Sequence, residues 1–197
     1  MNLNRKRRTI LKMAAAVGLP TSLATVRAEP PTQPMMQRPI HDSGEQLPVI
    51  GLGTYQSFGV GSGDNEREPL REVLRQFVAH DGAVIDSSPM YGTSESVVGD
   101  LTAQLSLRPR LFMATKVWTS GQGAGIDQMN ESFRRMRVDV MDLMQIHNLT
   151  DWRTHSKTLA EWKAEGKVRY TGVTHYHAGA HASLESIMKL RTFDFSQ

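Results

Sequence analysis

The sequence contains no cysteine among its 197 residues, so these residues can form no disulfide bond. A long hydrophobic run is also missing, because the apolar stretch from Met13 to about Leu23 is too short to span a bilayer comfortably. Acidic residues are absent from residues 1–28, which carry six basic side chains. The rest of the chain therefore holds 17 basic and 20 acidic residues. This mildly acidic body argues against nucleic-acid binding.

The first 28 residues are typical of an export signal. A basic segment with Arg7 and Arg8 precedes the apolar stretch, and Val26-Arg27-Ala28 offers small or medium residues before a cleavage point. The segment resembles a twin-arginine signal, which predicts the twin-arginine export machinery as a partner and a periplasmic location. An ordinary Sec signal or a disordered basic tail is the alternative, and a signal that does not function would leave the protein cytoplasmic. A proline-rich linker is expected over residues 29–46.

From residue 47 onward, short β-branched runs alternate with helical patterns. The expected strands are residues 49–53, 83–85, 111–117, 140–146 and 168–173, with a sixth opening at 193–195. Apolar residues at helical spacing follow them, near residues 70–78, 97–105, 126–136, 159–162 and 184–188. Strands that alternate with helices predict a parallel sheet with crossover helices.

Two α/β architectures fit this alternation. A doubly wound sheet usually has a glycine-rich phosphate turn after its first strand, but the Gly51-Leu52-Gly53 segment lacks the third glycine of that fingerprint. We therefore expect a (β/α)8 barrel. Such a barrel takes about 250 residues, so the chain is expected to be incomplete, with five to six of the eight strands, in a partial domain over residues 47–197.

Polar side chains stand at the ends of four expected strands: Asp86, Lys116, His147, and the pair Thr174 and His175. Each has an ordinary alternative, such as a helix cap, a lysine reaching solvent from a strand edge, or a core histidine. In a barrel, however, the carboxyl ends of the strands meet at one rim, where catalytic residues gather. Their common position therefore favours a site.

Carbonyl reduction needs a proton donor for the oxygen while hydride reaches the carbon. Tyr91, in the loop after the second strand, is the candidate acid, and a nearby Lys116 ammonium is expected to lower its pKa. Asp86 is expected to keep Lys116 charged in an apolar strand. His147 is the candidate that orients the substrate carbonyl.

The sequence resembles the aldo/keto reductase family. Four segments in order carry the resemblance: GAVIDSSPMYGTSE (82–95), ATKV (114–117), DLMQIHN (142–148) and GKVRYTGV (166–173). It implies a (β/α)8 barrel that reduces a small-molecule carbonyl substrate with NADPH, with NAD as the alternative cofactor. The tetrad of that family falls on Asp86, Tyr91, Lys116 and His147.

The resemblance also implies cofactor contacts. Besides Asp86, the residues near the cofactor would be Gly53, Thr54, Tyr55, Thr174 and His175. The last two stand where many members have Ser and Asn against the nicotinamide amide. The chain is expected to be a C-terminally truncated member without strands seven and eight, whose loops hold the cofactor phosphates in the family. We therefore expect the 197-residue chain alone to bind NADPH weakly or not at all.

Two other functions remain open. A metal-dependent barrel hydrolase would use Asp86, His147, His175 and His177, whereas the reductase interpretation needs no metal. A non-catalytic scaffold on the same barrel is the other alternative. The remaining histidines, His41, His80, His155 and His181, are expected on helix surfaces or in loops, in contact with solvent.

Overall fold

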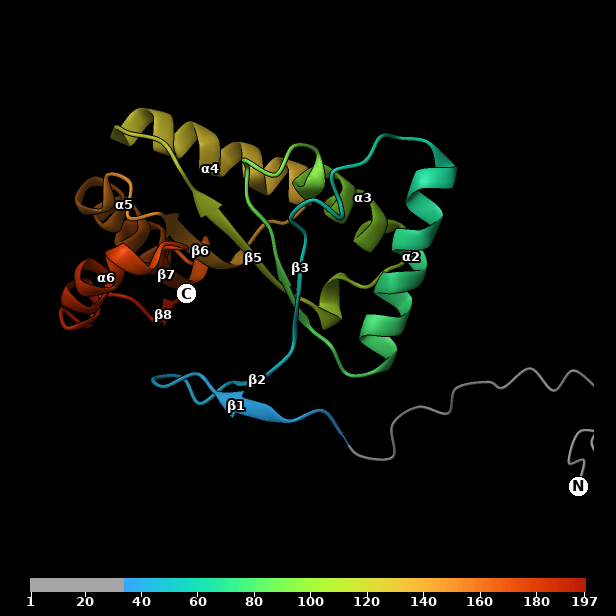
Figure 1. The fold of residues 1–197 in the computed structure, drawn as a ribbon, viewed down its shortest axis with the longest axis horizontal. Helices are drawn as coiled ribbons and strands as arrows, with labels where there is room; N and C mark the ends of the chain where they lie inside the picture. Colours follow the sequence, from blue (N-terminus) through green and yellow to red (C-terminus); the bar gives the residue numbers. More distant parts are fainter. Residues whose placement is uncertain (1–33) are drawn as a thin grey trace, which may run out of the picture. The chain divides into compact units, whose positions relative to one another are not determined.

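The computed structural model describes residues 34–197 (Figure 1). The expected export signal at residues 1–28 and the first residues of the expected linker lie outside this part of the chain. Within it, none of the helices combines the length and the apolar character that crossing a membrane requires.

One sheet of six parallel strands organises the described residues, and its strands follow one another in chain order. They are β3 (Gly51–Gly53), β4 (Val84–Asp86), β5 (Phe112–Val117), β6 (Met141–His147), β7 (Val168–Thr174) and β8 (Phe195–Ser196). The connecting helices are α2 (Asp64–Ala79), α3 (Ser94–Gln104), α4 (Gln122–Met136), α5 (Trp152–Ala164) and α6 (His181–Met188). Figure 1 shows the helices on the outer side of a curled sheet. The expected incomplete (β/α)8 barrel is confirmed.

Because side chains alternate along a strand, every second one points outward and packs against the helices. Ile85, Met113 and Met144 point outward and are fully buried with Leu101 and Leu159 of the helices. This layer is the main hydrophobic core. The side chains between them, such as Phe112 and Leu143, point to the inner face of the sheet and form a second, smaller apolar cluster.

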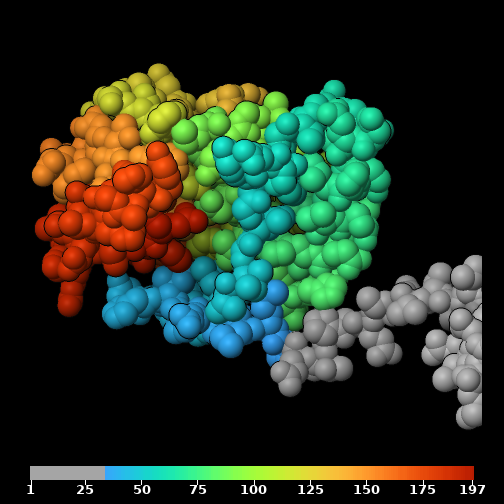
Figure 2. Space-filling model, viewed as in Figure 1, coloured from blue at the N-terminus to red at the C-terminus, as the bar shows by residue number. Residues whose placement is uncertain are grey.

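An antiparallel hairpin closes the inner face at the end opposite the strand C-termini. It consists of β1 (Gln37–Pro39) and β2 (Gln46–Pro48) and runs along the lower edge of the domain in Figure 2. Ile40, in its turn, is 6% exposed and belongs to the inner apolar cluster. The described part of the range 29–46 thus differs from the expected linker, because its apolar residues cover an apolar end of the sheet.

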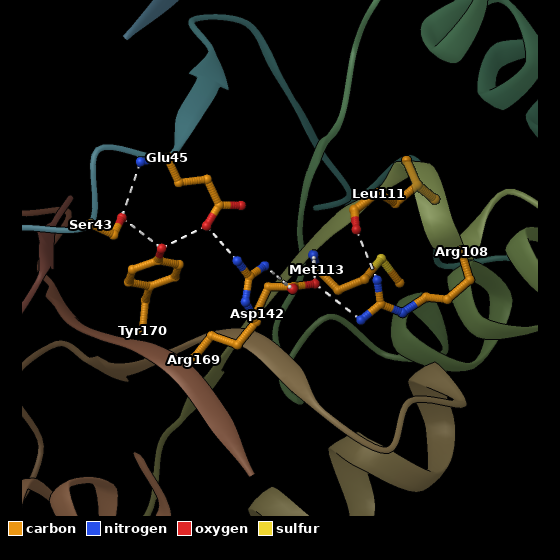
Figure 3. A network of polar contacts seen from close by, with 8 residues as sticks. All are labelled: Ser43, Glu45, Arg108, Leu111, Met113, Asp142, Arg169 and Tyr170. Carbon is orange, nitrogen blue, oxygen red and sulfur yellow. Dashed lines mark hydrogen bonds and ion pairs between the residues drawn. The ribbon is translucent and has the colours of Figure 1, made fainter. Parts of the chain in front are cut away.

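Charged groups fasten this hairpin to β6 and β7 (Figure 3). Arg169 donates to Asp142 at 2.7 Å and also contacts the Glu45 carboxylate. The Tyr170 hydroxyl donates to the same carboxylate at 2.6 Å. Arg108, from a short 3-10 helix before β5, donates to Asp142 at 3.0 Å. The buried Asp142 carboxylate therefore lies between two guanidinium groups.

His155 is fully buried, contrary to the expectation that it contacts solvent. Its ring packs against Gly125 of α4, where a Cβ atom would lie 2.4 Å from the imidazole. Nε2 lies 2.7 Å from the carbonyl oxygen of Thr119. The glycine leaves room for the ring between α4 and α5, which a helical pattern in one segment does not reveal.

Candidate active site

The inner face of the sheet collects the predicted site residues because of strand alternation. Lys116 follows Phe112 and Ala114 on the inner side of β5, and His147 follows Leu143 and Gln145 on that of β6. Asp86 and Thr174 end β4 and β7 on the same side. Phe112, Ala114 and Leu143 fill the lower layers of the barrel, and the polar residues lie above them.

Lys116 and Asp86 form a buried ion pair. Lys116 Nζ lies 2.7 Å and 2.6 Å from the two carboxylate oxygens of Asp86 and 2.8 Å from the carbonyl oxygen of Ser87. The lysine side chain is 3% exposed and the aspartate side chain 21%. These three contacts match the three N–H donors of an ammonium group. Gln145 adds a donor to Asp86 Oδ1 at 3.3 Å.

Burial acts on both members of this pair. It lowers the pKa of Lys116, and the Asp86 carboxylate opposes that change. It likewise raises the pKa of Asp86, and Lys116 opposes that change. Each charge thus offsets part of the desolvation of the other.

Tyr91 lies beside this pair, and its ring centroid is 5.5 Å from Lys116 Nζ. Burial is the main cause that raises the pKa of Tyr91 above its usual value, followed by the charge of Asp86 and the neighbouring Tyr55. The lowering expected from Lys116 is therefore wrong. The expectation fails because the Lys116 ammonium directs its donors to Asp86 and Ser87, and because the Asp86 carboxylate offsets the charge of the ammonium.

His147 is the last residue of β6 and lies near the same group of side chains. Its Nδ1 lies 2.9 Å from Thr174 Oγ1, and the two residues are register partners on β6 and β7. Burial, together with the charges of Lys116 and His175, lowers the pKa of His147 to about 4. The imidazole is consequently neutral at pH 7.

These residues meet in one pocket of about 180 Å³. Its lining residues are Asp86, Tyr91, Lys116, His147, Thr174, His175, Tyr176 and Gln197. All four members of the predicted tetrad are among them. A larger cavity of about 570 Å³ lies below, between the hairpin and the inner face of the sheet, and it also reaches Asp86. In Figure 2 the surface is hollowed between the cyan segment that contains β3 and the red C-terminal residues.

The predicted cofactor residues occupy different positions. Thr174 and His175 line the pocket. Thr54 is fully buried, and its hydroxyl is hydrogen-bonded to Ser87 Oγ at 2.9 Å. Tyr55 is 63% exposed, and its ring centroid lies 5.0 Å from that of Tyr91. Gly53 pairs with Asp86 in register, and no atom lies within 4 Å of the place where its Cβ would be.

Exposed aromatic residues surround the pocket. Trp118 is 43% exposed, and its ring lies edge-on to His147 with centroids 6.3 Å apart. Tyr176 is 82% exposed and stacks on His175. The sequence left the place of Trp118 open and did not single out Tyr176 or Gln145. The position of Gln145, two residues before His147 on the same strand, was the available signal.

The alternative metal site finds no support in the geometry. Within residues 34–197, no three His, Cys, Asp or Glu side chains come close enough together to hold a metal ion. His177 instead begins a short 3-10 helix, where its ring accepts a hydrogen bond from Gly179 N.

Comparison with known proteins adds independent observations. The model of the aldo/keto reductase family matches residues 49–196. Methylglyoxal reductase YeaE of Escherichia coli is 32% identical over 147 residues, which are 71% of this chain and 50% of that protein. Glyoxal reductase of Bacillus subtilis is 26% identical over 155 residues, 75% of this chain and 51% of the relative. The chain spans about half the length of the relatives it matches.

Solved structures agree with these matches. An aldo/keto reductase from Klebsiella pneumoniae in complex with NADP and acetate is 28% identical, with a TM-score of 0.60 over 72% of this chain and 50% of that one. A structure from the same organism in complex with NADPH is 27% identical, with a TM-score of 0.62 over 77% of this chain and 54% of the other.

Proposed function

This chain belongs to the aldo/keto reductase family, and we propose that it reduces an aldehyde or ketone to an alcohol with NADPH as the cofactor. The observation that carries the proposal is one pocket lined by a phenol, a buried lysine–aspartate pair and a neutral imidazole. The relatives are named as methylglyoxal and glyoxal reductases. Small dicarbonyl compounds are therefore the first substrates to test.

Tyr91 is the proposed proton donor. The Tyr91 hydroxyl would give its proton to the carbonyl oxygen, while bound NADPH would supply the hydride for the carbonyl carbon. The raised pKa keeps this phenol protonated at neutral pH, as a general acid must be before the reaction. The phenolate that remains would lie near the Lys116 ammonium, because Lys116 Nζ is 5.5 Å from the centroid of the Tyr91 ring.

The residues at the ends of β3 and β7 suit a bound nicotinamide group. Gly53 leaves the inner face beside Asp86 open, because nothing stands where its Cβ would be. Thr174 and His175 bring a hydroxyl and an imidazole to the same pocket. We assign the cofactor amide to these two residues and the backbone of Gly53. The Thr54 hydroxyl supports β4 instead, since it is bonded to Ser87.

The exposed aromatic rings define the substrate entrance. Trp118, Tyr55 and Tyr176 present apolar faces around polar groups that converge on one point. Such an arrangement suits a small carbonyl compound with an apolar substituent.

The test is NADPH oxidation by the purified, folded chain with methylglyoxal, glyoxal and a panel of aldehydes and ketones. NADPH is supplied in large excess over the protein, so that weak binding does not hide turnover, and NADH is the parallel assay for the alternative cofactor. We expect Tyr91→Phe to lower kcat by roughly 10²- to 10⁴-fold, the usual contribution of a general acid.

Matched controls come from the same entrance. Tyr55→Phe and Tyr176→Phe remove phenol hydroxyls near Tyr91 and should keep most of the turnover. A folded chain that oxidises no NADPH with any carbonyl would support the non-catalytic scaffold. Turnover that survives Tyr91→Phe but is lost in Tyr176→Phe would show that Tyr176, and not Tyr91, is the acid.

Export remains a separate prediction, because it concerns residues 1–28. It is tested by fractionating cells that express the chain and its Arg7→Lys/Arg8→Lys variant. Periplasmic protein that depends on the arginine pair would support the twin-arginine signal.

A further inference from the structure

His147 can exist as either of two neutral tautomers, and the reaction needs a particular one. To hold a carbonyl oxygen, the ring nitrogen that faces the substrate must carry a hydrogen. If that nitrogen were bare, its lone pair would repel the oxygen. The identity of the protonated nitrogen is set by the hydrogen bond that the other nitrogen makes.

The Thr174 hydroxyl contacts that other nitrogen. Thr174 Oγ1 lies 2.9 Å from His147 Nδ1, and Thr174 is 3% exposed. This contact is the only side-chain hydrogen bond of Thr174 within residues 34–197. Backbone pairing of the two strands places both residues at the same level, His147 opposite Thr174. The contact is thus built into the sheet.

A count of donors decides the direction of this hydrogen bond. If His147 Nδ1 carried the hydrogen and donated to Oγ1, the hydroxyl hydrogen of a buried threonine would have no acceptor among residues 34–197, which costs free energy. If the hydroxyl donates to a bare Nδ1, its hydrogen is satisfied. The ring hydrogen then lies on Nε2, which has no protein partner in the described residues and belongs to a ring that lines the pocket.

We infer that Thr174 is a positioning residue that fixes His147 in the tautomer with its hydrogen on Nε2, so that Nε2 donates to the substrate oxygen. This inference rests on the proposed function and deepens it. Thr174 Oγ1 keeps its capacity to accept a hydrogen bond while it donates to Nδ1. Its proposed contact with a cofactor amide is therefore compatible with this role.

The surroundings favour a neutral ring throughout. Lys116 on β5 and His175 after β7 face His147, and both oppose a positive charge on it. Asp86 lines the same pocket, but its carboxylate is occupied by Lys116. A neutral imidazole leaves the choice of tautomer to Thr174.

The test is nitrogen NMR of the histidine side chains in the full chain, with the His147 signals assigned by their loss in His147→Gln. We expect wild type to show the pattern of a protonated Nε2 and a bare Nδ1. Thr174→Val keeps the side-chain shape but removes the hydroxyl, so it should give a mixture of tautomers. Thr174→Ser should restore the wild-type pattern.

The matched control is Thr158→Val, because Thr158 is a buried threonine on α5 whose hydroxyl makes no hydrogen bond in the described residues. It should leave the His147 pattern unchanged. Thermal unfolding of each variant checks that it is folded. A wild-type signal with the hydrogen on Nδ1, or a pattern that Thr174→Val does not alter, would overturn the inference.

Kinetics form a second, independent readout. In carbonyl reduction, Thr174→Val should lower kcat about tenfold or more, and Thr174→Ser should recover most of it. Absence of turnover in folded wild type would overturn the proposed function but leave the NMR result intact. The two failures are therefore distinguishable.

Discussion

Lys116 Nζ contacts both carboxylate oxygens of Asp86, at 2.7 Å and 2.6 Å, inside the top layer of the barrel. Because burial opposes the charge on each group and the partner restores it, neither can be removed without leaving the other in an unfavourable position. The pair therefore has a structural role in addition to the proposed catalytic one.

The first prediction concerns this coupling. Asp86→Asn should lower the free energy of unfolding by roughly 3–5 kcal/mol, since it leaves a buried lysine without its counter-charge. The double variant Asp86→Asn/Lys116→Met should lose less than Asp86→Asn alone, because no unpaired charge remains. Urea denaturation of Asp86→Asn, Lys116→Met and the double variant measures the coupling. Effects that simply add would show that the two charges do not depend on each other.

A second prediction tests the contact between α3 and α4. A Cβ atom on Gly99 would lie 2.1 Å from the carbonyl oxygen of Arg135, so Gly99→Ala should force the helices apart and cost about 1–3 kcal/mol. Gly123, on α4, has nothing within 4 Å of its Cβ position. Gly123→Ala should instead stabilise the protein by about 0.5–1 kcal/mol, from the helix preference of alanine.

Chemical denaturation of both variants decides this point. If the two substitutions changed stability in the same direction, the close approach of α3 to α4 would be disproved.

The third prediction concerns pH. The pKa of His147 is about 4 in the folded chain, against about 6.5 in an unfolded one. Between these values the unfolded state binds more protons, so the free energy of unfolding should fall as the pH decreases from about 6.5 to about 4. Well above pH 6.5 the imidazole is neutral in both states and contributes no slope.

Carboxylates also titrate in this range, so the measurement is a difference between variants. Urea unfolding of wild type and His147→Gln at several pH values should show a shallower acid-side decrease for the variant. Parallel curves would mean that His147 titrates normally in the folded chain.

The parallel sheet and the meeting of Asp86, Lys116 and His147 at one rim could be predicted from the sequence because both depend on local patterns. Each strand was marked by a short apolar or β-branched run, and Asp86, Lys116 and His147 stood at or near the end of one, with Tyr91 in the loop that follows Asp86. Strand alternation then brought Asp86, Lys116 and His147 to the inner face without any long-range information.

The errors arose where the outcome depends on packing between distant segments. Residues 34–46 looked like a linker because of their prolines, but Ile40 reaches an apolar cluster built by β5 and β6. His155 looked like a surface residue until Gly125, on another helix, made room for it. The pKa of Tyr91 is raised mainly by burial and next by the charge of Asp86, and the extent of burial depends on how distant segments pack around the ring.

The last prediction tests whether the hairpin belongs to the domain. Ile40 is 6% exposed against the inner cluster, whereas Met36, four residues earlier and just before β1, is 67% exposed. Ile40→Ala should therefore cost about 2–5 kcal/mol, the range for truncation of a buried aliphatic side chain. Met36→Ala should change stability by less than about 0.5 kcal/mol. Denaturation measures both, and hydrogen exchange of the hairpin amides reports whether the loss is local or global.

Faster exchange confined to residues 37–48 would show that the hairpin opens by itself, so that the cavity of about 570 Å³ behind it becomes accessible from that end. Equal costs for Ile40→Ala and Met36→Ala would favour the linker that the prolines indicated. The Glu45 contacts with Arg169 and Tyr170 argue against the linker, because they join the hairpin turn to β7 independently of Ile40. With those contacts intact, Ile40→Ala should weaken the closure of this end without releasing the turn.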